Sequence, residues 1–216
     1  MLSDLFNAPS IHKAHSRSLE PVVLHGKDAI RCSVVRGENM DGHWGGKPKA
    51  EFSLLDTKPW GTIRTYGFSI LIPGSWKNTN TLTCVFDCHS YPDTEDVLWP
   101  PQPLVLYIQN DTFRWAYSYD VNKQTVVKPI FLWLGNPVYY GKDVETDWKV
   151  EVRFAFDDTG FINIWRNGQF FLSHTGPNCM NDAKSPYATI GLYEFDWSHS
   201  ENSRELYLTN WNANYL

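Results

Sequence analysis

The chain has 216 residues, a length that suits one large domain or two small ones. Its 10 Trp, 11 Tyr and 12 Phe favour β-strands, and its 20% charged residues exclude a disordered chain or a coiled coil. The net charge of −5, from 19 basic and 24 acidic residues, argues against a general nucleic-acid binder. We therefore expect no nucleic-acid partner.

No run approaches the roughly 18 apolar residues of a membrane-spanning helix, so no membrane partner is expected either. Residues 1–18 lack the apolar centre of a secretory signal, and we expect them to form a leader that could be mobile. The compartment stays open, because the chain could act inside a cell or a virion, be exported by another route, or have lost a signal. The oligomeric state is open as well.

Short runs of alternating apolar and polar residues, separated by Gly, Pro, Asn and Asp, predict β-strands along the chain. In chain order the predicted strands are residues 28–36, 49–55, 62–72, 81–89, 103–109, 112–119, 125–133, 147–157, 160–172, 187–196 and 204–211. The clearest runs from Trp148 to Phe156, with Lys149, Glu151 and Arg153 on its polar face. The absence of helical periodicity predicts a sandwich of two antiparallel sheets.

The four cysteines are predicted to be buried free thiols. Cys84 and Cys88 lie four residues apart in one predicted strand, roughly 13 Å, which is too far for a mutual disulfide. Strand alternation places both on the face opposite His89, so Cys84-x-x-x-Cys88-His89 is not expected to bind zinc. His12 and His15 lie in the leader. We therefore predict no metal site.

One carboxylate pair suggests a different enzyme. Glu194-Phe-Asp196 is similar to the acidic pairs of sandwich-fold glycosidases. A retaining glycosidase needs a partner carboxylate about 5 Å away on the same face, and the next one, Glu201, follows a loop. Glycoside hydrolysis stays a minor alternative.

Four segments, in this order, resemble known enzymes. They are Tyr66–Trp76, Gly160–Gly168, Gly176–Asp182 and Pro186–Tyr193. Together they resemble the heparin-lyase-I-like and glucuronan-lyase-like polysaccharide lyases, over roughly Ala29–Leu208. The combination of Y-G-F-S-x-x-x-P with G-P-N, N-D and I-G-x-Y is more specific than any of these motifs alone.

The resemblance implies a concanavalin-like, all-β jelly-roll sandwich, with a single domain over residues 1–216. It also implies β-elimination on an acidic, uronate-containing polysaccharide. One group neutralises the C5 carboxylate, a base removes the C5 proton, and an acid protonates the oxygen leaving C4. No organic cofactor is implied. A structural calcium is compatible with such a sandwich, although no run of ligands here requires it.

The resemblance also implies which residues act. Proton transfer falls to His89, in Asp87-Cys-His89 where the family usually has Gln-x-His, and to Tyr193, which closes the I-G-x-Y strand. Lys49-Ala-Glu51 stands where the family tends to have Arg-x-Glu lining the groove. The Asp87 carboxylate would repel a uronate unless it is paired or protonated, so it could change the substrate or neutraliser, or abolish activity.

Strand alternation partly agrees with these roles. It places Leu82, Cys84, Phe86 and Cys88 on one face and Val85, Asp87 and His89 on the other. Likewise Thr189, Gly191 and Tyr193 oppose Ile190 and Leu192, and Glu194 is turned away from Tyr193. Both His89 and Tyr193 should therefore leave the core side and could share a groove.

Further residues are candidates for binding. A His can take or give a proton near neutral pH, whereas a Tyr needs a nearby cation to act as a base. The cations that could supply this charge or bind a uronate are Lys49, Arg64, Arg114 and Arg153. Asn178 could bind the carboxylate or the sugar. The aromatic side chains that could stack on sugar faces are Trp99, Trp133, Tyr139 and Tyr140.

Each candidate also has a purely structural interpretation: a strand-end His, an edge Tyr, a turn Asn or core aromatics. The leading hypothesis is a polysaccharide lyase. If so, it would act on an extracellular or capsule glycan and could be virion-associated. The main alternative is a non-catalytic carbohydrate-binding or virion structural module on the same scaffold. The arrangement of the groove should separate the two, because a lyase needs His89 and Tyr193 close together.

Overall fold

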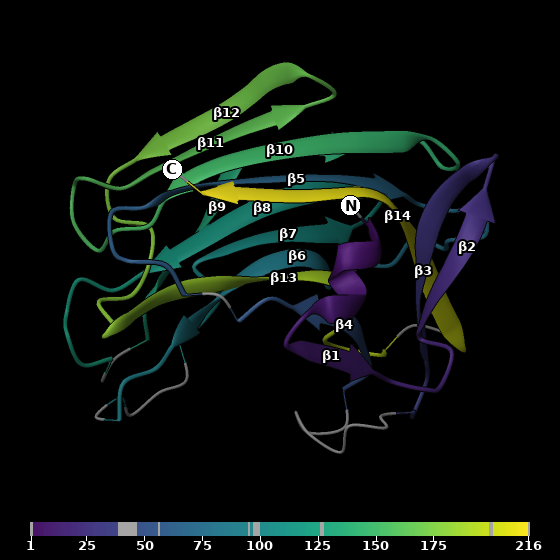
Figure 1. Ribbon diagram of the computed structural model, residues 1–216, viewed down its shortest axis with the longest axis horizontal. Coiled ribbons are helices and arrows are strands. Elements are labelled where there is room, and N and C mark those ends of the chain that lie inside the picture. The colour runs from purple at the N-terminus through teal and green to yellow at the C-terminus, as the bar shows by residue number, and fades with distance from the viewer. Residues whose placement is uncertain are drawn as a thin grey trace.

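The structure, a computed structural model, describes residues 2–38, 47–55, 57–94, 96, 100–125, 128–198 and 201–215. It consists of two seven-stranded antiparallel sheets that pack face to face (Figure 1). This architecture confirms the predicted all-β sandwich. Among the described residues, no helix is long and apolar enough to cross a membrane.

The first sheet, here named the front sheet, carries the candidate site. Its strand order is β1 (Ser10–Lys13), β4 (Lys49–Ser53), β13 (Lys184–Glu194), β6 (Thr83–Tyr91), β7 (Leu104–Gln109), β8 (Thr112–Tyr119) and β9 (Ile130–Tyr139).

The second sheet is named the back sheet. Its strand order is β12 (Gln169–Thr175), β11 (Phe161–Arg166), β10 (Glu145–Arg153), β5 (Ile63–Leu71), β14 (Ser203–Tyr215), β3 (Lys27–Val35) and β2 (Leu19–Leu24). Strands that are neighbours in each sheet are often distant in sequence, as Figure 1 shows for β4, β13 and β6.

The predicted strands match the structure, apart from shifts of a few residues at several strand ends and three larger differences. Residues 160–172 form two strands, β11 and β12, because Asn167 and Gly168 take positive φ angles of 50° and 75° and reverse the chain. Strand β9 begins at Ile130 rather than at residue 125. Strands β1 and β2 are not predicted, since β1 is short and β2 contains a proline at the sheet edge.

Residues 2–18 pack against the sandwich, whereas the sequence predicts a leader that could be mobile. Leu2–Asn7 form a 3-10 helix (η1) whose Leu5 is buried, and β1 pairs with β4 at the edge of the front sheet. Ala14 and Ser18 are also buried. The apolar contacts of this segment are therefore part of the core.

The core lies between the sheets and is rich in aromatic rings. Phe68 stacks on Phe86 with ring centroids 4.8 Å apart, and Phe86 meets Trp115 edge-on at 6.0 Å. Trp115 in turn contacts Trp148 of the back sheet at 5.5 Å. Such pairs add to the stabilisation that burial alone provides. All four cysteines are buried free thiols, as predicted.

A β-bulge in β6 decides which side chains reach the outer face of the front sheet. The register with β7 shifts between Cys84 and Phe86, so Val85 and Phe86 both join the core. Cys84 instead packs with Tyr107 and Tyr193 on the other face. The prediction that Cys84 shares a face with Phe86, and Val85 with Asp87, is therefore wrong, because the extra residue of a bulge breaks the alternation.

Candidate active-site cleft

A cleft of about 790 Å³ lies on the outer face of the front sheet. His89 from β6 and Tyr193 from β13 both line it. The other lining residues are Lys47, Lys49, Pro100, Pro101, Gln102, Lys128, Pro129 and Phe195. Among the described residues the lining holds three lysines and no carboxylate, which makes the cleft attractive to an anionic polymer.

Tyr193 is held in a protonated state. Its ring is 8% exposed and lies under Lys49, whose Nζ is 4.0 Å from the ring centroid. Burial raises the pKa of Tyr193 above its usual value, and the nearby Glu51, Cys84 and Asp87 raise it further. The hydroxyl is therefore suited to donate a proton rather than to accept one.

His89 is fixed on two sides. Its ring stacks on Tyr187 of the neighbouring β13 at a centroid distance of 5.4 Å, and its Nε2 lies 3.1 Å from Oδ2 of Asp87. Burial lowers the pKa of His89, but the charges of Asp87 and Glu51 outweigh this and raise it on balance. The raised pKa makes the imidazole a stronger base than an ordinary histidine.

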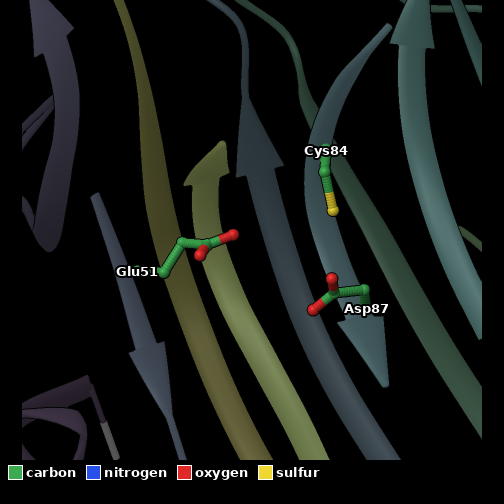
Figure 2. A group of neighbouring side chains, drawn as sticks. All are labelled: Glu51, Cys84 and Asp87. Atoms are coloured by element: carbon green, nitrogen blue, oxygen red, sulfur yellow. The ribbon is translucent and has the colours of Figure 1, made fainter. Parts of the chain in front are cut away.

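A buried cluster of Glu51, Cys84 and Asp87 lies on the same face of the sheet. Figure 2 shows the Cys84 thiol and the Asp87 carboxylate converging on β6, with the Glu51 carboxylate reaching toward them. One ligand-type atom from each residue lies within 4.8 Å of the others. Burial raises the pKa of Glu51 to about 7, Lys49 opposes this shift, and Asp87 adds to it.

Among the described residues, this cluster is the one whose ligand atoms lie close enough together to surround a metal ion. However, Lys49 Nζ lies 3.5 Å from Glu51 Oε2, and His89 contacts Asp87. Each carboxylate therefore already has a positively charged or protonatable neighbour. Charge balance does not call for a metal here, and we assign none.

Gly191 allows strands β13 and β4 to pair closely beside the cluster. It is paired with Glu51 across β13 and β4 and has a φ of 149°, where L-residues with side chains are strained. A Cβ at this position would lie 2.1 Å from the carbonyl oxygen of Ala50. The glycine of the I-G-x-Y motif therefore has a packing role directly beside the cluster.

Three predicted binding residues lie elsewhere. Arg64, on β5 of the back sheet, is 1% exposed and donates to Ser185 Oγ and the Pro186 carbonyl. Asn178 is fully buried, and its Oδ1 accepts a hydrogen bond from the Ala155 amide. These two side chains are structural, because their polar atoms are used inside the sandwich.

Arg153, at the end of β10, lines a second cleft of about 560 Å³ together with Trp60 and Phe156. It therefore does not join His89. The alternation that predicts its outward orientation says nothing about which of the two sheets carries it.

Arg114 lies on the front sheet, but not in the lining of the cleft. Its guanidinium stacks 3.7 Å from the ring centroid of Trp133 and donates to Gln109. An aromatic row connects this position to Tyr193, because Phe195 contacts Tyr193 at 4.1 Å and Tyr107 at 5.8 Å.

The remaining aromatic candidates differ in accessibility. Tyr107 contacts Trp133 at 6.0 Å, and Trp133 is 40% exposed. Tyr139 is exposed, whereas Tyr140 is buried. Trp99 lies outside the described residues. Trp133 is therefore the aromatic candidate that is both accessible and connected to the cleft.

Glu194, the first carboxylate of the pair that suggested a glycosidase, and Glu201 are both engaged by Arg204. Glu194 Oε2 lies 3.1 Å from Nη1 of the buried Arg204, and Glu201 Oε2 lies 2.9 Å from its Nε. Glu194 also accepts a hydrogen bond from Thr83 at 2.8 Å. It is turned away from the cleft, as alternation predicts, and does not form an accessible acid pair.

Several lining residues were not predicted from the sequence. Lys47, Gln102 and Lys128 lie outside the strands, where no periodicity places them. Cys84, which belongs to the buried cluster and not to the lining, was not predicted on this face because of the bulge. Phe195 could have been inferred from its alternation with Tyr193 along the same chain segment.

Comparison with known proteins shows the family. A sequence profile described as polysaccharide lyase matches residues 7–212, so the chain belongs to the polysaccharide lyase family. A comparison with curated proteins finds no match.

Solved structures share the fold. An endo-β-1,4-glucuronan lyase from the fungus Trichoderma reesei has a TM-score of 0.81 at 14% identity, covering 95% of this chain and 90% of that one. An alginate lyase from a Chlorella virus has a TM-score of 0.68 at 11% identity, covering 99% and 96%. An alginate lyase of polysaccharide lyase family 7 has a TM-score of 0.62 at 13% identity, covering 94% and 84%.

Proposed function

We propose that this polysaccharide lyase cleaves a uronic-acid-containing glycan by β-elimination in the cleft of the front sheet. The observation that carries the proposal is that His89 and Tyr193 line one lysine-rich cleft in a chain of this family. The named substrates of the similar structures, glucuronan and alginate, are both acidic polysaccharides, which supports the same class of substrate here.

The positive side chains would bind the substrate. Lys49 lies over the ring of Tyr193, while Lys47 and Lys128 lie in loops that also line the cleft. In our proposal Lys49 faces the C5 carboxylate and neutralises it, which makes the C5 proton more acidic. Asp87 is fully buried against His89 and is not among the lining residues, so its carboxylate does not contact the substrate carboxylate directly.

The reaction then needs one base and one acid. Neutral His89 takes the C5 proton, the electron pair forms the C4=C5 double bond, and the bond between C4 and the glycosidic oxygen breaks. Tyr193 donates its proton to that oxygen. The resulting imidazolium and phenolate return to their starting forms by proton exchange, so the enzyme is unchanged and no water is added to the sugar.

A non-catalytic binding module is the second candidate, favoured by the aromatic row from Tyr193 to the exposed Trp133. Stacking on such a row needs no base. A binding module, however, would not require His89 and Tyr193 to line the same cleft.

Ultraviolet absorbance of the unsaturated sugar end distinguishes the two. We expect it to rise when the protein is incubated with one of a panel of glucuronan, alginate, heparin, hyaluronan and capsule preparations. No rise on any polymer, with glycan binding in calorimetry, would contradict the lyase and support the binding module. The responding polymer would also identify the substrate.

A further inference from the structure

We propose that Asp87 is a positioning residue for His89: it holds the proton on Nε2 and leaves Nδ1 as the nitrogen that accepts the C5 proton. The inference deepens the proposed function and rests on it. It concerns the position at which this chain departs from the Gln implied by the resemblance.

The position of Asp87 determines which nitrogen of the His89 ring is available to the substrate. Nε2 lies 3.1 Å from Asp87 Oδ2, and the Asp87 side chain has no solvent exposure. The contact does not meet hydrogen-bond geometry, and the other described neighbour that could donate to Asp87 is the Cys84 thiol. An unprotonated Nε2 would turn its lone pair toward this carboxylate, so the proton is favoured on Nε2.

The ring cannot easily turn to offer the other nitrogen to Asp87. Tyr187 stacks on one face of the imidazole with an interplanar angle of 24°, and Tyr91 packs against Tyr187 at 4.8 Å. The His89 side chain keeps 16% exposure and lines the cleft. With Nε2 directed at Asp87, Nδ1 is the remaining nitrogen for a substrate.

The charges around His89 stabilise the imidazolium that forms when the ring takes up the C5 proton. The acidic groups near His89 are Asp87 on its own strand and Glu51 on β4, while Tyr187 and Tyr193 approach from β13. The positive groups are Lys49 on β4 and, across the cleft, Lys47 and Lys128. Asp87 is the one in direct contact, so its charge stabilises the imidazolium most.

An amide at this position could not act in the same way. A carboxylate offers only acceptors and a full negative charge, so it selects the Nε2–H tautomer and strengthens the base. An amide can donate as well as accept, so it permits either tautomer and adds no charge. The departure from Gln thus changes how the base is prepared rather than removing it.

The direct test is nitrogen NMR of the imidazole in the full-length protein without substrate. The His89 signals are assigned by their loss in His89→Gln. We expect wild-type His89 to be the Nε2–H tautomer, and its pKa to fall by about one pH unit or more in Asp87→Asn. Asp182→Asn, which changes another buried aspartate outside the cleft, should leave the His89 pKa unchanged.

Kinetics give a second measurement. Neutral His89 is required, so kcat/KM falls as the pH drops through the His89 pKa. In Asp87→Asn this acid limb should move to lower pH, and kcat should fall by about tenfold or more with little change in KM. A merely structural Asp87 would leave the acid limb in place.

Two results would overturn the inference: an Nδ1–H tautomer in the wild-type protein, or an unchanged His89 pKa in Asp87→Asn. The tautomer is measured in the wild-type protein, with His89→Gln used only to assign the signals, so the test stands even if Asp87→Asn does not fold. A protein with the expected tautomer but no unsaturated product would contradict the proposed function instead.

Discussion

The two clefts of this sandwich are similar in size but arranged differently. The active-site cleft, about 790 Å³, exposes lysines and keeps its carboxylates, Glu51 and Asp87, beneath the surface. The second cleft, about 560 Å³, has Arg153 and Lys123 in the same lining as Asp157 and Asp182.

The difference shows that charge placement, not volume, distinguishes the clefts. In the second cleft the positive and negative groups share one surface, so the field offered to an acidic polymer partly cancels. Burial raises the pKa of Asp182 to about 7, and Asp96 and Asp93 add to this effect, but the described lining of this cleft contains neither His nor Tyr. Of the two clefts, as far as their described residues show, the front-sheet cleft is the one that combines proton-transfer groups with an anion-binding surface.

The largest expected effect comes from removing the proton-transfer groups. Tyr193→Phe and His89→Asn should each lower kcat at least about 100-fold, because general acid–base catalysis contributes on that scale. Absorbance of the unsaturated product measures this loss.

The matched controls are Tyr207→Phe on the back sheet and His25→Asn in a turn. Both should keep wild-type rates, and all four variants should keep nearly the same melting temperature. A fully active Tyr193→Phe or His89→Asn would exclude that residue from catalysis.

A smaller effect is expected from the exposed lysines of the cleft. The double variant Lys47→Gln/Lys128→Gln should raise KM several-fold and weaken the salt dependence of kcat/KM, because two positive charges near the polymer are lost. Initial rates at several salt concentrations measure both effects.

The control is the double variant Lys123→Gln/Lys184→Gln, which changes the net charge equally. These two lysines line a separate surface pocket beside Tyr91. If both double variants raise KM equally, the attraction comes from the net charge of the protein rather than from the cleft.

The smallest expected effect is on the pH dependence of the unfolding free energy, and it comes from Glu51 in the buried cluster. The pKa of Glu51 is raised from 4.5 to about 7, chiefly by burial. Between these pH values the folded protein keeps a proton that the unfolded chain loses, so this group costs stability as the pH rises. Glu51→Gln should remove that part of the pH dependence.

Urea unfolding at several pH values measures it, with Glu205→Gln, a partly exposed residue of β14, as the control. We expect the unfolding free energy of wild type, relative to Glu51→Gln, to fall as the pH rises through this window. An equal pH dependence in both proteins would mean that Glu51 is ionised throughout.

The sequence predicts the sandwich because alternation is a local signal. Trp148, Val150 and Val152 show it clearly, and the Asn167-Gly168 turn follows from backbone preference alone. The convergence of His89 and Tyr193 is also predicted, since their motifs and their outward orientation agree.

The remaining features depend on contacts between distant segments. A bulge such as that at Cys84–Phe86 depends on pairing with β7 and leaves no trace in the alternation. Arg64 and Asn178 are residue types that often bind substrates, yet their hydrogen-bond partners are residues far away in the sequence, Ser185 and Ala155. Lysines in loops carry no periodicity, so their place in the cleft could not be predicted.

The central claim, β-elimination by His89 and Tyr193, is tested most directly by the mass of the products made in water enriched with heavy oxygen. Elimination breaks the bond at C4 without adding water. The account therefore predicts oligosaccharides with one unsaturated end and no heavy oxygen, and none of these products from Tyr193→Phe. Saturated products carrying one heavy oxygen at the new end would show hydrolysis and would contradict it.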